Sequence, residues 1–168
     1  MFYGLTYLGT FHTAVSIVAV IAGLVALVRD KQITLHNGIG KLYVITTIIT
    51  CVTGFGIFQH GGFGKPHMLG IITLVVLAIA YAAGTTQWFG RASKYVEVVS
   101  YSLTFLFHWI PAITETSTRL PLGAPLLSSP DAPELQKATA VLLVLFVIGA
   151  ALQIMRLRKT PMGIPVMS

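Results

Sequence analysis

Five long apolar segments, separated by short polar ones, constrain the fold of this chain more than any other feature of its sequence. They cover about residues 8–28, 38–58, 67–86, 95–114 and 134–155. A helix needs about 20 apolar residues to cross about 30 Å of hydrocarbon, and its backbone groups must then find their partners within the segment. The sequence therefore predicts an all-α transmembrane bundle of five helices.

The composition supports one membrane-embedded domain. Of the 168 residues, 55% are hydrophobic and 10% are charged, and the mean hydropathy is +0.82. Soluble domains carry many more charges. The loops leave no room for a second domain, so residues 1–168 are expected to form a single bundle in contact with the lipid bilayer. The lone Cys51 excludes an intrachain disulfide and a cysteine-based zinc site.

Charged and proline-rich stretches mark the ends of the apolar segments. Arg29, Asp30 and Lys31 follow the first segment, and a glycine-rich turn over residues 60–66 separates the second from the third. Four prolines within residues 116–133 predict an external loop there. The first residues lack the positive charge and the small-residue cleavage site of a secretory signal, so the first segment is expected to stay in the mature protein.

The basic residues predict the orientation of the chain. One side of the predicted membrane would carry Arg29, Lys31, Lys41, Arg91, Lys94, Arg156, Arg158 and Lys159, and the other side Lys65, Arg119 and Lys137. Because cytoplasmic loops carry the excess of Lys and Arg, the first set is expected to be cytoplasmic. This places the N-terminus outside and the C-terminus inside a bacterial inner membrane. The scattered cations form no stripe or tail, which argues against a nucleic-acid partner.

Four of the five histidines are predicted near the outer leaflet, namely His12, His60, His67 and His108, and His36 is expected at the opposite face. Imidazole is costly in hydrocarbon and is a common haem or metal ligand. At 1.5 Å per residue, His12 lies roughly 6 Å below the outer end of the first segment, and His108 lies roughly 6 to 10 Å below the outer end of the fourth. We therefore expect a buried pair at matched depth, with the other two at the interface.

Polar residues recur at helical spacing in three segments. The fourth segment carries Ser100, Thr104, His108, Pro111 and Glu115; the first carries His12, Ser16, Ala19 and Gly23; the second carries Thr46, Thr50 and Thr53. Such rows should face the bundle interior, because lipid offers no hydrogen-bond partner. Small and hydroxyl residues also line helix contacts that have no catalytic role. The rows alone therefore leave a structural and a functional interpretation open.

Three chemistries fit these residues. The leading one is a cytochrome-like redox protein that holds a single haem b between His12 and His108, with His67 as substitute ligand, and exchanges electrons with quinol or an external partner. A non-haem metal could instead recruit His12, His60, His67 and His108 together with Glu115, although no HExxH motif is present. A proton or small-solute path could follow the fourth segment from Glu97 through Tyr101, Thr104 and His108 to Glu115.

A non-catalytic reading ranks between the haem and the transport hypotheses. The protein would then be a membrane subunit, scaffold or homo-oligomer without a cofactor, whose histidines are structural or bind metal incidentally. A buried neutral histidine can simply bond to a backbone carbonyl or to Glu115. The small-residue rows and the proline-rich loop would then serve association with a partner.

One stretch resembles a known family. The residues His36-Asn37-Gly38-Ile39-Gly40-Lys41-Leu42-Tyr43-Val44, followed by Val52-Thr53-Gly54-Phe55 and Gly61-Gly62-Phe63-Gly64, resemble small bacterial multi-span membrane proteins of unassigned function. In that family a span opens with a His-x3-Gly-Lys/Arg-x-Tyr pattern, and the likeness covers about a third of the chain, from Leu35 to Gly84. The family's usual second histidine is absent from Gln87 to Lys94. A more distant likeness to haem b membrane cytochromes, which place histidine pairs near both leaflets, implies at most one outer haem here.

Overall fold

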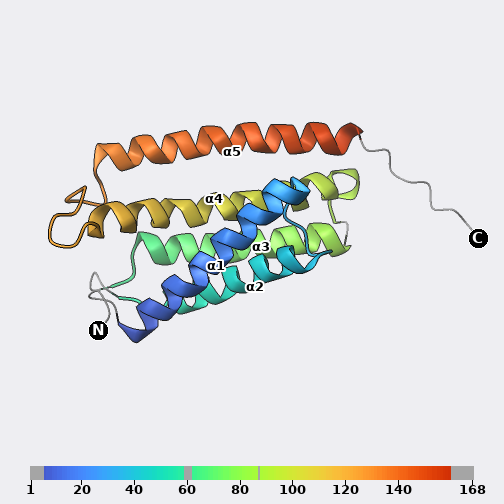
Figure 1. Cartoon of the computed structure of the whole chain (residues 1–168). Coiled ribbons are helices and arrows are strands. Elements are labelled where there is room, and N and C mark those ends of the chain that lie inside the picture. The colour runs from blue at the N-terminus through green and yellow to red at the C-terminus, as the bar shows by residue number, and fades with distance from the viewer. Residues whose placement is uncertain (1–5, 59–61, 87, 160–168) are drawn as a thin grey trace, which may run out of the picture.

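The computed structural model describes residues 6–58, 62–86 and 88–159, and its regular elements in these ranges are helices. The five long helices are α1 (Tyr7–Asp30), α2 (Gly38–Gly54), α3 (Lys65–Thr86), α4 (Ser93–Arg119) and α5 (Pro133–Lys159), and a short 3-10 turn, η1 (Gly90–Ala92), precedes α4. Successive long helices run in opposite directions (Figure 1), so α1 begins and α5 ends at opposite ends of the bundle. The expected all-α class is confirmed.

Four helices, α1, α3, α4 and α5, are long and apolar enough to cross a membrane. The fifth, α2, has 17 residues. At 1.5 Å per residue it spans about 26 Å, slightly less than a typical hydrocarbon core. The number of crossings and their direction therefore stay predictions.

Two helix boundaries differ from those expected. The second segment leaves α-helical geometry at Gly54 rather than near Phe58, because the Gly56 and Ile57 amides bond to the carbonyls three residues earlier, those of Thr53 and Gly54. The fourth continues to Arg119, through Pro111, so the proline-rich loop begins four residues later than expected, at Leu120. One proline removes a single helical N–H, and a helix packed among others tolerates that loss.

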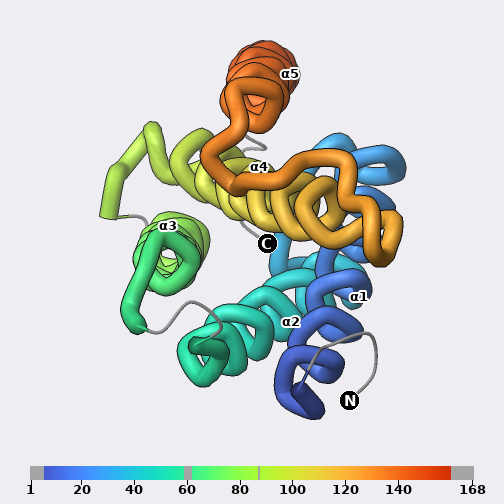
Figure 2. Tube along the Cα trace, turned by 90° about the vertical axis from the view of Figure 1, so that its left-hand side faces the viewer, coloured from blue at the N-terminus to red at the C-terminus, as the bar shows by residue number. Residues whose placement is uncertain are grey.

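The helices pack as two close pairs, α1 with α2 and α3 with α4. By backbone approach α5 contacts only α4 among the described helices, and Figure 2 shows it at the edge of the bundle, beside α4 and away from α1, α2 and α3. The buried core combines small residues with two tyrosines: Ala22, Ala26, Ile33, Tyr43, Leu77, Ala80 and Tyr101. Hydroxyl groups therefore reach the centre of an otherwise apolar bundle.

Candidate functional site

Four hydrogen bonds join polar side chains of different helices among the described residues; one links Ser102 of α4 to Gln153 of α5, and each of the other three has a threonine on one side. The Tyr43 hydroxyl lies 2.8 Å from Thr104 Oγ1, which links α2 to α4. His108 Nε2 of α4 lies 3.0 Å from Thr47 Oγ1 of α2. His12 Nδ1 of α1 lies 3.0 Å from the Thr53 hydroxyl of α2. Both intramembrane histidines expected to be functional thus contact the same helix.

The threonines determine which atom donates in each bond. Thr104 Oγ1 also lies 2.8 Å from the Tyr101 carbonyl, Thr47 Oγ1 lies 2.7 Å from the Tyr43 carbonyl, and Thr53 Oγ1 lies 2.8 Å from the Ile49 carbonyl. A threonine hydroxyl has one proton, which it gives to the carbonyl, so its other partner must donate. His108 therefore carries its proton on Nε2 and His12 carries its proton on Nδ1.

The two imidazoles occupy different heights along α2. Their threonine partners are six residues apart, which corresponds to about 9 Å along the helix. The His108 side chain is buried, whereas that of His12 is only half-buried. His12 packs against Gly54, where a Cβ atom would lie 3.2 Å from the imidazole Cε1. The two imidazoles therefore do not share a height along α2, because the expected match was counted from an end of the fourth segment near residues 112–114, whereas α4 continues to Arg119.

Tyr43 and Thr47 lie one turn apart on α2 and face α4 together. The Tyr43 hydroxyl bonds to Thr104, and the Thr47 hydroxyl bonds to His108. The Tyr43 ring also meets the His108 ring edge to face, with centroids 6.0 Å apart. These four side chains therefore form one polar cluster at the contact between α2 and α4.

Each end of this network carries one glutamate and one histidine that interact electrostatically without a direct hydrogen bond between them in the described residues. At the end where α1 begins, the exposed carboxylate of Glu115 interacts electrostatically with His12 and forms a salt bridge with Arg119. At the opposite end, the half-buried carboxylate of Glu97 interacts with the exposed His36. Both ends therefore carry groups that can exchange protons with water.

Tyr101 lies between Glu97 and Thr104 along α4. Its side chain is 1% exposed, and its hydroxyl has no hydrogen-bond partner among the residues that the structure describes. It interacts electrostatically with Glu97, one helical turn away. We use the name polar column for the whole set, which in order from the end where α2 begins to the end where α1 begins is His36, Glu97, Tyr101, Thr104, Tyr43, Thr47, His108, His12 and Glu115.

His67 lies outside the polar column. Its imidazole is stacked between Phe58 and Phe63, with ring centroids 5.0 and 5.1 Å away. Its Nδ1 accepts a hydrogen bond from the Gly64 amide at 3.2 Å, and Nε2 is buried without a partner in the described ranges. It is thus a buried residue, not the solvated interfacial one that its position in the sequence indicated.

The residues considered for a metal site are dispersed. Among residues 6–58, 62–86 and 88–159, no three His, Cys, Asp or Glu side chains form a group that could hold a metal ion. This applies to His12, His67, His108 and Glu115, while His60 lies outside the described residues. A metal or haem at these histidines stays a prediction.

Tyr43 and Thr47 are the functional candidates that the sequence analysis missed. The expected row on α2 was Thr46, Thr50 and Thr53, but the Thr46 and Thr50 hydroxyls bond to carbonyls of their own helix. The four-residue spacing from Tyr43 to Thr47 places both on one helix face, and this spacing could have identified them from the sequence.

The structure gives physical roles to the motif that opens α2. The Asn37 side chain caps the helix by accepting from the Gly40 amide at 2.8 Å, and the His36 amide donates to Thr34 Oγ1 at 3.3 Å. Gly40 packs directly on the Thr34 backbone, where any Cβ would collide with the carbonyl. The motif therefore shapes the entry to α2 and positions Tyr43 in the column.

Comparison with models of protein families, with curated proteins and with solved structures found no match. The resemblance of residues Leu35 to Gly84 to small bacterial membrane proteins therefore stays a prediction.

Proposed function

We propose that the protein conducts protons across a bacterial inner membrane, along the polar column, in a five-span bundle with its N-terminus outside. The observation that carries this proposal is the position of His108. It is buried, its Nε2 lies 3.0 Å from Thr47 Oγ1, and its ring meets the Tyr43 ring edge to face. Ionisable residues inside membrane bundles mark ion pathways and proton relays.

The hydrogen-bond directions define how a proton would move. His12 donates its Nδ1 proton in a hydrogen bond to Thr53, so the lone pair on its Nε2 can accept a proton from the Glu115 end of the column. His108 has the opposite arrangement, so it can accept at Nδ1 and release its Nε2 proton to Thr47. For the path to continue toward Tyr101 and Glu97, the Thr47 and Thr104 hydroxyls must turn their protons from the carbonyls of their own helices toward the next group. Water would bridge the steps that have no direct bond: from Glu115 to His12, from His12 to His108, from Thr47 to Tyr43, and from Thr104 through Tyr101 to Glu97.

Proton flux into proteoliposomes tests the proposal. A potassium diffusion potential drives protons inward, and an enclosed pH dye reports the rate. We expect His108→Gln to lower the rate at least tenfold, because glutamine can donate to Thr47 but cannot accept and release a proton. The control is Thr85→Val, since that exposed hydroxyl bonds only to the Tyr81 carbonyl of its own helix. Wild-type flux no faster than in protein-free liposomes, or unchanged flux in His108→Gln, would refute the proposal.

A single haem b at His12 is the second candidate, in a redox protein that exchanges electrons with quinol or an external partner. It is favoured by one observation: His12 Nδ1 is fixed on Thr53, which leaves Nε2 available. A fixed Nδ1–H is the usual arrangement of a metal-ligating imidazole. The visible spectrum and metal content of the purified protein decide this point, because the haem proposal requires a Soret band that changes in His12→Ala.

A further inference from the structure

A hollow separates the inner ends of α1 and α5. Its volume is about 350 Å³, and its lining residues are Leu27, Lys31, Gly149, Leu152, Gln153 and Arg156. Across it, α5 reaches the end of α1 through two hydrogen bonds, from Gln153 Nε2 to the Lys31 carbonyl at 3.0 Å and from Arg156 Nη1 to the Asp30 carbonyl at 2.8 Å. These bonds hold the helix ends together while the helices themselves stay apart.

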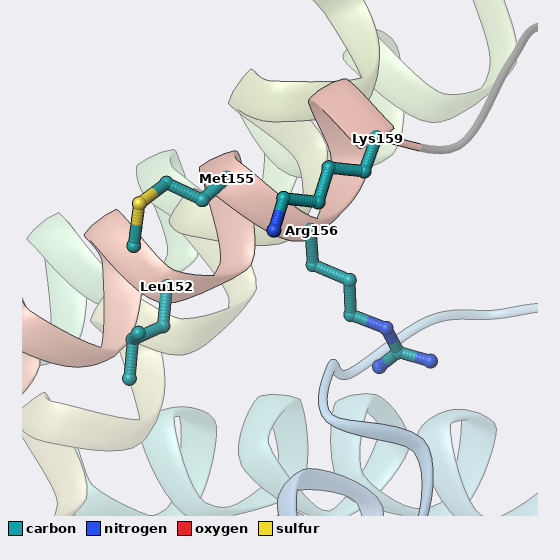
Figure 3. A pocket seen from close by; sticks show the side chains of 4 residues that line it. All are labelled: Leu152, Met155, Arg156 and Lys159. Carbon is teal, nitrogen blue, oxygen red and sulfur yellow. The ribbon is translucent and has the colours of Figure 1, made fainter.

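A second hollow of about 400 Å³ adjoins the first along α5 and is lined by Leu152, Met155, Arg156 and Lys159. Figure 3 shows Arg156 extending away from Leu152 and Met155, toward a neighbouring segment of the chain. Two of the lining residues, Leu152 and Arg156, belong to both hollows. The two hollows are therefore neighbours on α5, apolar along the helix and cationic at its end.

The charges around the hollow favour an anion. Lys31 and Arg156 line it, and Lys159 lies one turn beyond. The nearby carboxylate, Asp30, is engaged by Arg29 through two hydrogen bonds of 2.8 Å and by Asn37 through one of 3.0 Å. Arg156 donates Nη1 to the Asp30 carbonyl and interacts electrostatically with the Asp30 carboxylate, and its guanidinium adds to the positive charge of Lys31 and Lys159 around the hollow.

We propose that this hollow binds one anionic phospholipid, with an acyl chain between α1 and α5 and the phosphate at Lys31 and Arg156. The apolar side has the space for a chain, because at Gly149 a Cβ would meet nothing within 4 Å. Basic pockets between membrane helices on the cytoplasmic side recognise acidic lipid headgroups. The site is separate from the polar column, so it stands whether or not the protein conducts protons.

The test is the thermal unfolding of the full-length protein in detergent with added lipid. We expect phosphatidylglycerol to raise the Tm saturably by several degrees. Phosphatidylcholine with the same acyl chains, diacylglycerol and inorganic phosphate are expected to leave the Tm within about one degree. Equal shifts with the anionic and the zwitterionic lipid, or a shift with phosphate alone, would overturn the proposal.

Two variants test the headgroup contact and the acyl-chain contact separately, and a third is the control. Lys31→Gln should weaken the response at the headgroup, and Gly149→Leu should fill the space for the chain, each lowering the apparent lipid affinity at least fivefold. Arg158→Gln removes the same charge from an exposed residue that does not line the hollow, so it should respond like the wild type. A loss in Arg158→Gln equal to that in Lys31→Gln, or a full response in Gly149→Leu, would contradict a defined site.

Discussion

Threonine hydroxyls order the hydrogen bonds in the interior of this bundle. Each of Thr47, Thr53 and Thr104 gives its proton to a carbonyl of its own helix and can therefore only accept from a neighbouring helix. A tyrosine or an imidazole placed opposite must donate. These three threonines thus determine which atom carries the donated proton in His108, His12 and Tyr43.

The first prediction concerns the two histidine tautomers. We expect nitrogen NMR of the imidazoles to show His108 protonated on Nε2 and His12 protonated on Nδ1 at neutral pH, because each faces a threonine acceptor through that atom. In Thr47→Val, which removes the acceptor of His108 alone, the signals of His108 should change and those of His12 should stay. The same tautomer on both residues would show that the donor assignment is wrong.

At the scale of the helices, close contact between Gly40 and the Thr34 backbone determines how the preceding loop packs against the start of α2. The second prediction is that Gly40→Ala lowers the free energy of unfolding by about 2 kcal/mol or more, since overpacking against a backbone carbonyl cannot be relieved by a rotamer change. Gly38→Ala is the matched control, because a Cβ there meets nothing within 4 Å. Its effect should stay below about 0.5 kcal/mol. Reversible unfolding in mixed detergent micelles measures both, and equal effects would contradict the packing argument.

The sequence predicted the helices because apolar length and charged ends are local properties. Of the interior row expected on α4, Thr104 and His108 are buried, whereas Glu115 is exposed. The sequence did not predict which threonines of α2 reach across to other helices, since Thr46, Thr47 and Thr50 differ only in which neighbour each faces. Nor did it give the relative depth of His12 and His108. Depth depends on how helices slide past one another, and that is decided by tertiary contacts such as the packing of His12 on Gly54.

At the scale of the whole molecule, the chain forms two close helix pairs and a fifth helix that packs on α4. The loop between α4 and α5 returns to the end of the bundle where α3 begins, and the Lys65–Asp131 salt bridge of 2.7 Å joins the two. Lys94 Nζ donates to the Leu157 carbonyl at 3.1 Å at the opposite end. Both ends of α5 are therefore placed by residues outside it.

The third prediction concerns the number of membrane crossings, which depends on α2. If this 17-residue helix crosses, α1 begins and α5 ends on opposite sides of the membrane. We expect a membrane-impermeant maleimide to label Tyr7→Cys and Ser128→Cys in intact cells, and Lys159→Cys only after permeabilisation, all in a Cys51→Ser background. These three positions are exposed, whereas Cys51 is buried. Labelling of Tyr7→Cys and Lys159→Cys from the same side would mean that α2 does not cross, and then the polar column could not connect the two sides of the membrane.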